Sequence, residues 1–480
     1  MLLPVLVAVG ICLIPVWLVR RSLPSEERAN CVGVHVRSEA VRNASIAYGM
    51  RIAVLAPMFA WGMSGDWWPA VVVTIGLALG VWLIYALRAP LVAFIDAALR
   101  ENRSITIAGF IAYRHGSDAR VRRTTASLTV IALLGSLVAE ALALTAFLES
   151  TLPGGGAIVW LLVLGVLALA ALQSIPAGHS GVVEAMQWQL GMLYVGLAGS
   201  MALFLYLHVS ARTPPLPHGT LAIVLTAVWC GLHLYLHRSR YVDTTSSSRL
   251  LARFGKTLNG LLSIVFAAIL VVALMHLYAA EAASTVRDTA RALVTPARIP
   301  PVALMAIGLL ALFHPLVDVV NWQQLATIVR ITEPEERAFV LRRVFGGYAA
   351  RGALLLLFVW LLGAVAANAT GTDSPDALLR DDGDATMAIP LLLIAVVAAA
   401  MSTMSALSSA MLCTIRCDLA VDAPPARGVV MLGAGVLFAS LAGMAFTGLS
   451  FVAWLVVACC LQLALGALVI GDRFVKRPGR

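Results

Sequence analysis

A row of hydroxyl side chains occupies an apolar segment in the last third of the chain. In the segment AVVAAAMSTMSALSSAMLC, residues 395–413, five hydroxyls stand among small residues: Ser402, Thr403, Ser405, Ser408 and Ser409. Lipid cannot hydrogen-bond a hydroxyl, so a helix of this composition should face other helices or a polar cavity. Hydroxyls and backbone carbonyls are also oxygen ligands for an alkali cation. The residues alone leave both interpretations open: tight helix packing, or a cation site.

Ionisable side chains in other apolar segments form a second group of candidates. Arg51, Glu140, Glu184 and His314 all lie in or beside such segments. A charged side chain is costly within a membrane and normally faces a cavity or a partner. The guanidinium of Arg51 would suit a carboxylate ligand, or it would form a structural pair with Glu140 or Glu184. The two glutamates are also candidates for a proton pathway. His314, directly before Pro315, would line the same pocket or form a hydrogen bond in the core.

The composition of the chain predicts the elements that must position these residues. Of 480 residues, 60% are hydrophobic and 12% are charged, whereas a soluble domain carries about a quarter of charged residues. Apolar windows long enough to cross a lipid bilayer recur from end to end, which predicts an all-α polytopic membrane protein with about 13 transmembrane helices. The expected spans are residues 2–19, 45–63, 68–87, 126–150, 157–176, 185–208, 220–237, 257–280, 299–321, 345–368, 386–415, 426–447 and 450–471.

The net charge of +9 is concentrated in alternate loops rather than on one surface, which argues against a nucleic-acid partner. The acidic loop 369–385 alternates with the basic segments. By the positive-inside rule, the N-terminus lies outside and the C-terminus in the cytoplasm, and we expect a plasma membrane protein, the inner membrane in a bacterium. The basic segments are 88–125, 238–256, 322–344 and 473–480.

Two segments have charge patterns of their own in this topology. The loop 281–298 carries three arginines on the predicted outer side and could form an amphipathic surface helix. The first span, 2–19, lacks a basic segment before its apolar run and is followed by Arg20 and Arg21. This pattern is typical of a retained transmembrane helix rather than a cleaved signal peptide.

The chain lacks the sequence signatures of several enzyme classes. It has no Walker A loop, no dinucleotide-binding fingerprint and no H-E-x-x-H motif. Its seven cysteines do not have disulfide or zinc spacing. We therefore expect neither an enzyme nor an organic cofactor. A membrane enzyme would be the remaining alternative, but the acidic run 373–384 is better interpreted as a solvated outer loop.

Four segments carry motifs in a fixed order. Together they resemble the sodium/solute symporter family, which includes proline, pantothenate and sodium–glucose transporters. The resemblance covers about residues 40 to 470, and each motif is weak by itself. The segments are IAGFIAYRHG at 107–116, GVVEAMQWQ at 181–189, DVVNWQQLA at 318–326 and AAAMSTMSALSSA at 398–410.

This resemblance implies a core of five plus five helices in an inverted repeat, the LeuT-like architecture, in which two broken helices meet near the bilayer midplane. Spans 220–237 and 257–280 are additional to the usual pattern. The implied domains are a leading transmembrane helix at 1–21, a first five-helix repeat at 40–210, an inserted hairpin at 215–285, a second repeat at 299–472 and a cytoplasmic tail at 473–480.

The resemblance also implies a cation site between the first and eighth core helices. In the family, sodium is held by backbone carbonyls of the first core helix and by a carbonyl and two hydroxyls of the eighth. The matching positions are the carbonyls of Asn43, Ile46 and Ala399 and the hydroxyls of Ser402 and Thr403. A shift by one residue in the first core helix stays open. Sodium would then be the coupling ion.

Departures from the family pattern limit this site to one ion. A Thr-Asp pair, whose carboxylate is linked to a second cation position in some members, corresponds to Ala185 and Met186. The Asp that proline-type members carry near the first-helix site corresponds to Ser45. One sodium site is therefore supported, and two are not.

The implied function is a secondary active transporter that takes up a small organic solute with sodium by alternating access. The candidate pocket residues are Arg51, His314, Asp318 and Gln189, of which Arg51 lies close to positions that resemble substrate contacts in sugar-type members. Proton coupling and uncoupled facilitation are alternatives within transport. A membrane sensory module derived from a symporter is the alternative from another class.

Overall fold

The computed structural model describes residues 36–100, 105–152, 156–211, 219–236, 249–279, 300–373, 375–380 and 388–419, with a few single positions outside these ranges. Within them, all regular elements are helices, which confirms the all-α class. Seven helices are long and apolar enough to cross a membrane, or up to nine if each of two bent pairs counts as one span. The protein is an integral membrane protein with several spans.

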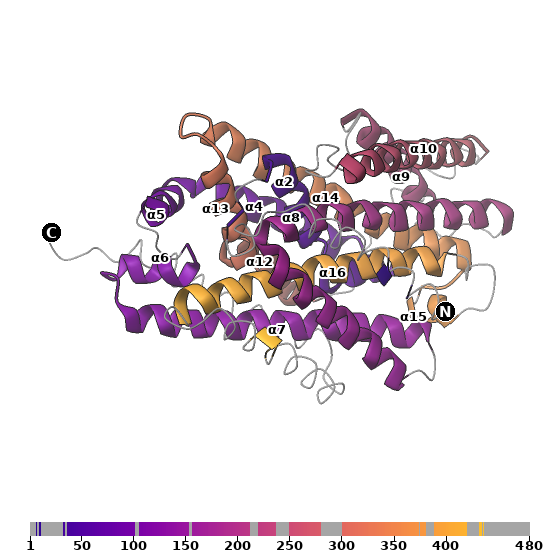
Figure 1. Cartoon of the computed structure of the whole chain (residues 1–480). Coiled ribbons are helices and arrows are strands. Elements are labelled where there is room, and N and C mark those ends of the chain that lie inside the picture. The colour runs from indigo at the N-terminus through magenta and orange to yellow at the C-terminus, as the bar shows by residue number, and fades with distance from the viewer. Residues whose placement is uncertain are drawn as a thin grey trace.

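Figure 1 shows the helices, coloured in chain order from indigo at the N-terminus to yellow at the C-terminus. Each begins and ends as follows: α2 Ser38–Gly49, α3 Ile52–Ser64, α4 Trp68–Ala86, α5 Arg88–Arg100, α6 Ile107–Arg114, α7 Ala119–Thr151, α8 Gly156–Ala211, α9 Gly219–Leu236, α10 Arg249–Ala279, α12 Pro301–Val317, α13 Val319–Ile331, α14 Arg337–Thr370, α15 Pro375–Arg380 and α16 Ile389–Thr414, which continues into a π-helical turn, Ile415–Leu419.

Some predictions fall on other parts of the chain. The predicted spans 426–447 and 450–471, the tail 473–480 and nearly all of the leading helix 1–21 lie outside the described residues. The loop 281–298 does so as well. The count of about 13 transmembrane helices, drawn from span length, therefore stays a prediction.

Helix α16 lies at the centre of the packing. It runs against α8 along much of its length and also contacts α7 and α2 (Figure 1). Every residue from Val397 to Thr414 is buried. The hydroxyl-bearing helix thus faces protein rather than lipid, as its composition predicts. Its surroundings, rather than its own sequence, must decide whether the hydroxyls serve packing or binding.

Two bent helix pairs begin the two predicted halves of the core. Helices α2 and α3 meet at an angle of 60° around Met50 and Arg51. Helices α12 and α13 meet at 41°, and Asp318 separates them. The predicted span 299–321 therefore continues as α13 to Ile331 instead of entering a loop. The polar run after Asp318 suggests a loop, yet its side chains are buried within the protein.

Helix α8 contains the two predicted spans 157–176 and 185–208. A sharp kink at Gly178 joins them, with backbone angles φ 59° and ψ −170°. This conformation is open to glycine and strained for residues with a Cβ atom. The second part of α8 therefore begins at Gly178, seven residues before the predicted start.

Helices α9 and α10 correspond to the predicted inserted hairpin and lie at one edge of the molecule (Figure 1). They pack on each other and against α8 and α14. The indole Nε1 of Trp229 donates a hydrogen bond of 2.6 Å to the carbonyl of Leu354. The Trp229 ring also stacks on Phe358, with ring centroids 4.2 Å apart. The hairpin is thus held to α14 by a specific aromatic contact.

Helices α3 and α14 approach each other so closely that their backbones touch. A Cβ atom on Gly62 would lie 2.0 Å from the carbonyl oxygen of Trp360, and one on Gly363 would lie 2.1 Å from that of Phe59. Small residues permit such contacts between membrane helices, where dispersion and close packing replace the hydrophobic effect. These two glycines fix the distance between α3 and α14.

We predict that Gly363→Ala destabilises the protein by about 1–3 kcal/mol, because the new methyl group would displace the backbone of α3. The measurement is the melting temperature of the purified protein in detergent. Gly346→Ala on the same helix is the matched control, because a Cβ atom there meets nothing within 4 Å. A melting temperature unchanged in both variants would show that α3 and α14 are not in backbone contact.

Candidate functional site

The break between α12 and α13 is built around Asp318. This residue has extended backbone angles, φ −75° and ψ 119°, and ends one helix while it caps the next. Its Oδ1 accepts a hydrogen bond of 3.0 Å from the backbone N–H of Val320. A carboxylate at this position satisfies a backbone donor that the break exposes and interacts favourably with the helix dipole.

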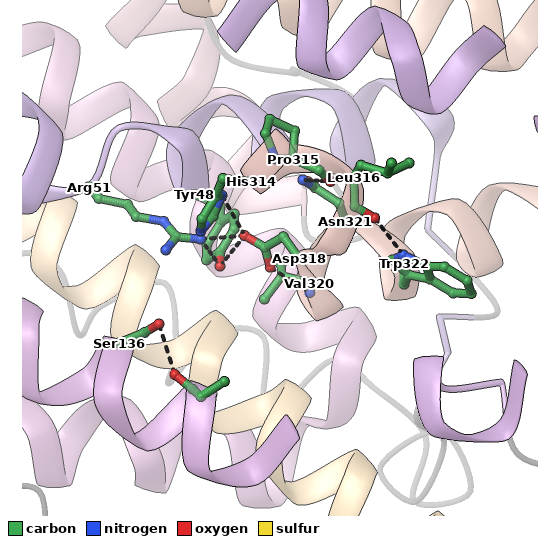
Figure 2. A network of polar contacts seen from close by, with 11 residues as sticks. Tyr48, Arg51, Ser136, His314, Pro315, Leu316, Asp318, Val320, Asn321 and Trp322 are labelled. Carbon is green, nitrogen blue, oxygen red and sulfur yellow. Dashed lines mark hydrogen bonds and ion pairs between the residues drawn. The ribbon is translucent and has the colours of Figure 1, made fainter. Parts of the chain in front are cut away.

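The carbonyls on the other side of this break are also satisfied by side chains. Asn321 Nδ2 donates to the carbonyl of Pro315, and Trp322 Nε1 donates to that of Leu316, both at 2.9 Å (Figure 2). Without such donors these carbonyls would be unpaired in a buried setting, at a substantial free-energy cost. The polar residues after Asp318 therefore stabilise the non-helical backbone at the break between α12 and α13.

The break between α2 and α3 has a different cap. Arg51 has extended angles, φ −69° and ψ 147°, and its side chain makes no capping bond to α3. Instead, Oε2 of Glu140 on α7 accepts the N–H of Ile52 at 3.1 Å. Glu140 is only 1% exposed. A carboxyl group from a third helix thus caps the start of α3.

An ion pair joins the two breaks. Nη2 of Arg51 is paired with Oδ2 of Asp318 and also donates to the hydroxyl of Tyr48 (Figure 2). The Tyr48 hydroxyl in turn donates to the same Asp318 oxygen at 2.6 Å. Nδ1 of His314 lies 3.6 Å from that oxygen. Three of the four predicted pocket residues, Arg51, His314 and Asp318, therefore meet at one point.

The structure gives Arg51 a partner that the sequence did not suggest. The structural pair was expected with Glu140 or Glu184, whereas the direct ion pair is with Asp318. Glu140 instead binds the backbone next to Arg51. The clue in the sequence was the position of Asp318, three residues after Pro315, where a helix break is expected and a carboxylate can cap it.

The hydroxyl helix reaches the end of α2. The Oγ of Ser402 donates to the carbonyl of Ala47 at 3.1 Å and to that of Ala399 at 2.9 Å. The Oγ1 of Thr403 is buried and has no hydrogen-bond partner among the described residues. Two carbonyls thus lie within hydrogen-bond distance of the Ser402 hydroxyl, and the next residue of the helix carries a buried hydroxyl without a partner among the described residues. This set of neutral oxygens fits an alkali cation.

The first-helix carbonyl beside Ser402 is that of Ala47, one residue beyond Ile46. The carbonyls of Ile46 and Ala47 both accept the backbone N–H of Met50, at 3.1 and 3.3 Å. Asn43 lies one turn earlier on α2, and its buried side-chain Oδ1 has no partner in the described ranges. A shift by one residue in the first core helix, which the family pattern leaves open, would bring the Ala47 carbonyl into the set in place of that of Ile46.

Buried amide side chains extend the polar interior. Gln324 Oε1 accepts from the hydroxyl of Ser45, and Gln173 Oε1 accepts from that of Ser405 at 2.9 Å. Gln189 is 1% exposed, and within the described part of the chain neither the oxygen nor the nitrogen of its side-chain amide has a hydrogen-bond partner. Helices α2, α8, α13 and α16, which carry these residues, pack on one another. Buried polar atoms without a protein partner are typical of places that water, an ion or a ligand fills.

Comparison with known proteins supports the fold. No protein-family model matches the chain, and no curated protein matches it. A solved structure of a Na+-coupled sialic acid symporter, in a substrate-bound outward-open state described as revealing a novel Na+ site, is similar over 98% of this chain and 85% of its own, with 14% identity and a TM-score of 0.61. At this identity the similarity shows the fold of a polytopic symporter, and this chain shares that fold.

We predict that Asp318→Asn alone destabilises the protein by about 3–5 kcal/mol, because it leaves the Arg51 guanidinium buried without its counter-ion. The double variant Arg51→Gln, Asp318→Asn should recover part of this loss. Melting temperatures of the single and double variants measure the coupling.

The control is the Arg337–Asp96 pair, 2.6 Å apart and more exposed than the pair at the breaks. Breaking it should cost about 1 kcal/mol or less. If the losses from Arg51→Gln and Asp318→Asn simply add, the two side chains do not depend on each other.

Proposed function

We propose that the chain is a secondary active transporter that couples sodium to the uptake of a small organic solute by alternating access. The observation that carries this proposal is the contact of Ser402 on α16 with the Ala47 carbonyl at the end of α2. It brings a hydroxyl of the continuous helix α16 to a backbone carbonyl in the last turn of α2, directly before the break between α2 and α3. The fold similarity to a Na+-coupled sialic acid symporter supports it.

The proposed cation ligands are the oxygens of Ala399, Ser402 and Thr403, with carbonyls from α2. Asn43 and Ile46 are the positions expected from the family pattern, and Ala47 is the carbonyl that contacts Ser402. A sodium ion bound there would supply positive charge that draws α2 and α16 together. It would favour the state in which the two helices are close, and the solute would gain affinity in the same state because linkage is reciprocal.

The proposed solute site lies between the two breaks. Arg51, Asp318 and His314 meet there, and Gln189 supplies an unbonded amide on α8. The breaks are also where the backbone leaves helical geometry, so the half-helices on either side have separate axes. Rocking of these half-helices would expose the site first to one side and then to the other.

We also propose the topology that the basic loops indicate. The N-terminus lies outside and the C-terminus in the cytoplasm of a bacterial inner membrane. With this orientation, α2 and α13 are the cytoplasmic halves of the two broken helices, and α3 and α12 are the outer halves. The buried amides on α2 and α13 would then line the cytoplasmic side of the pathway.

Proton coupling is the second candidate, and one observation favours it. Glu140 places a carboxyl group, almost fully buried, directly at the break between α2 and α3. Buried carboxyl groups at such places form the proton relays of many transporters. Uptake into proteoliposomes driven by a proton gradient without sodium would favour this mechanism over sodium coupling.

We predict that sodium raises the melting temperature of the purified protein relative to potassium at equal ionic strength, because it binds the folded state. Thr403→Val keeps the shape of the side chain and removes the unpartnered hydroxyl. It should weaken the apparent affinity for sodium by about tenfold or more, which corresponds to about 1.4 kcal/mol. Ser402→Ala should act in the same direction.

Thr414→Val on the same helix is the matched control. Its hydroxyl is buried but bonds to the Ala410 carbonyl of its own helix at 2.9 Å, so its loss should leave the sodium response unchanged. Sodium-driven uptake by proteoliposomes from a solute library completes the test. A sodium response that is absent, or that survives both Ser402→Ala and Thr403→Val, would refute the proposed cation site.

A further inference from the structure

We infer that the solute carries a protonated amine, which the carboxylates at the two helix breaks recognise. This inference rests on the proposed transport function and names the chemical class of its solute. It departs from the expectation that Arg51 receives a carboxylate of the solute. Three observations lead to it: the caps of the half-helices, the partner of Arg51 and the balance of charge at the breaks.

The N-terminal, positive ends of the half-helices α3 and α13 are already capped by side chains of the protein. Glu140 accepts the Ile52 N–H at the start of α3, and Asp318 accepts the Val320 N–H at the start of α13. In transporters with broken helices, such N-termini are the usual seats for an anionic group of the substrate. Here the chain supplies two carboxyl groups of its own at these positions. A carboxylate of the solute would have to displace one of them.

The guanidinium of Arg51 also has its partners within the protein. It is paired with Oδ2 of Asp318, and the Tyr48 hydroxyl binds both groups. The Arg51 side chain also lies over the Tyr48 ring, with its Cζ 4.2 Å from the centroid. An anionic solute would need to pull Arg51 away from Asp318 and leave a buried carboxylate without its counter-ion, which is unfavourable.

The charge balance at the breaks favours a cationic group. One guanidinium, that of Arg51, faces two carboxyl groups, those of Asp318 and Glu140. With both carboxyl groups ionised and His314, 3.6 Å from Asp318, neutral, the formal charge of these four groups is −1, and an ammonium group beside Glu140 would favour this ionised state. A protonated amine would neutralise it and would donate N–H bonds to carboxylate oxygens without breaking the existing ion pair. The proposed sodium site, by contrast, consists of neutral oxygens on α2 and α16.

The protonated amine is common to two kinds of solute, organic amines and amino acids. A simple amine would use the carboxylates alone. An amino acid would present its ammonium group to the carboxylates and its own carboxylate to Arg51, so that each charge keeps a partner. A matched set of small probes separates these sources: methylammonium, which has only the amine, acetate, which has only the carboxylate, and glycine, which has both.

The experiment measures the melting temperature of the full-length protein in detergent with each probe, against potassium chloride at equal ionic strength. We predict that methylammonium raises the melting temperature by about 1–2 °C at roughly ten times its dissociation constant, and that acetate does not. A glycine response as large as that of methylammonium, or larger, would indicate an amino acid. A methylammonium response without a glycine response would indicate a simple amine.

Glu140→Gln should abolish the methylammonium response, because the amide keeps the shape and the bond to Ile52 but removes the charge. Glu149→Gln is the matched control, since Glu149 lies on the same helix and is exposed. Stabilisation by acetate, no response to methylammonium, or a response that survives in Glu140→Gln would overturn the inference. If Glu140→Gln does not fold, the comparison of methylammonium with acetate on the unaltered protein decides alone.

Sodium titrations of the same samples separate this inference from the proposed function. A sodium response together with stabilisation by acetate would refute the amine and leave sodium coupling intact. A methylammonium response without a sodium response would refute sodium coupling and leave the amine intact.

Discussion

An interrupted helix inside a membrane exposes backbone donors and acceptors that lipid cannot satisfy, and in the described part of this protein the breaks of two bent helix pairs face each other. Each is completed by side chains: Asp318, Asn321 and Trp322 at one, Glu140 at the other. The ion pair between Arg51 and Asp318 then ties the two breaks together. The proposed site depends on these contacts, because the carboxyl groups that replace the missing backbone hydrogen bonds are the same groups that would contact a solute.

The hydroxyl helix has a dual character. Some of its hydroxyls bond to a carbonyl or an amide nearby, as Ser405 does with Gln173 and Thr414 with its own helix, which is ordinary packing chemistry. Ser402 reaches a backbone carbonyl of another helix, and the neighbouring Thr403 hydroxyl, like that of Ser408, is buried without a partner among the described residues. Packing and binding are therefore not exclusive on α16, and neighbouring residues serve different purposes.

Much of the fold follows from composition, because long apolar windows can only be helices in a bilayer. The all-α class and the burial of the hydroxyl helix were predictable for this reason, as was the meeting of Arg51, His314 and Asp318 once the family pattern was considered. The partner of Arg51 was not, since an ion pair between positions 267 residues apart depends on how two bent helices approach. The sequence did not predict the helix α13, because its run of amide side chains is typical of an exposed loop. The cap by Glu140 was not predicted either, because Glu140 is far in sequence from the break that it caps.

The glycine contact between α3 and α14 restricts how the molecule can move. Where two backbones touch, there is no layer of side chains to accommodate sliding, so packed helices of this kind exchange between discrete arrangements instead of shifting gradually. Helix α3 is therefore expected to travel with α14, and the Trp229 contact adds α9 to the same unit. The hairpin of α9 and α10 would then move together with α3 and α14. It would increase the area of this unit that faces lipid, so the motion of the unit would depend on the thickness and stiffness of the surrounding membrane.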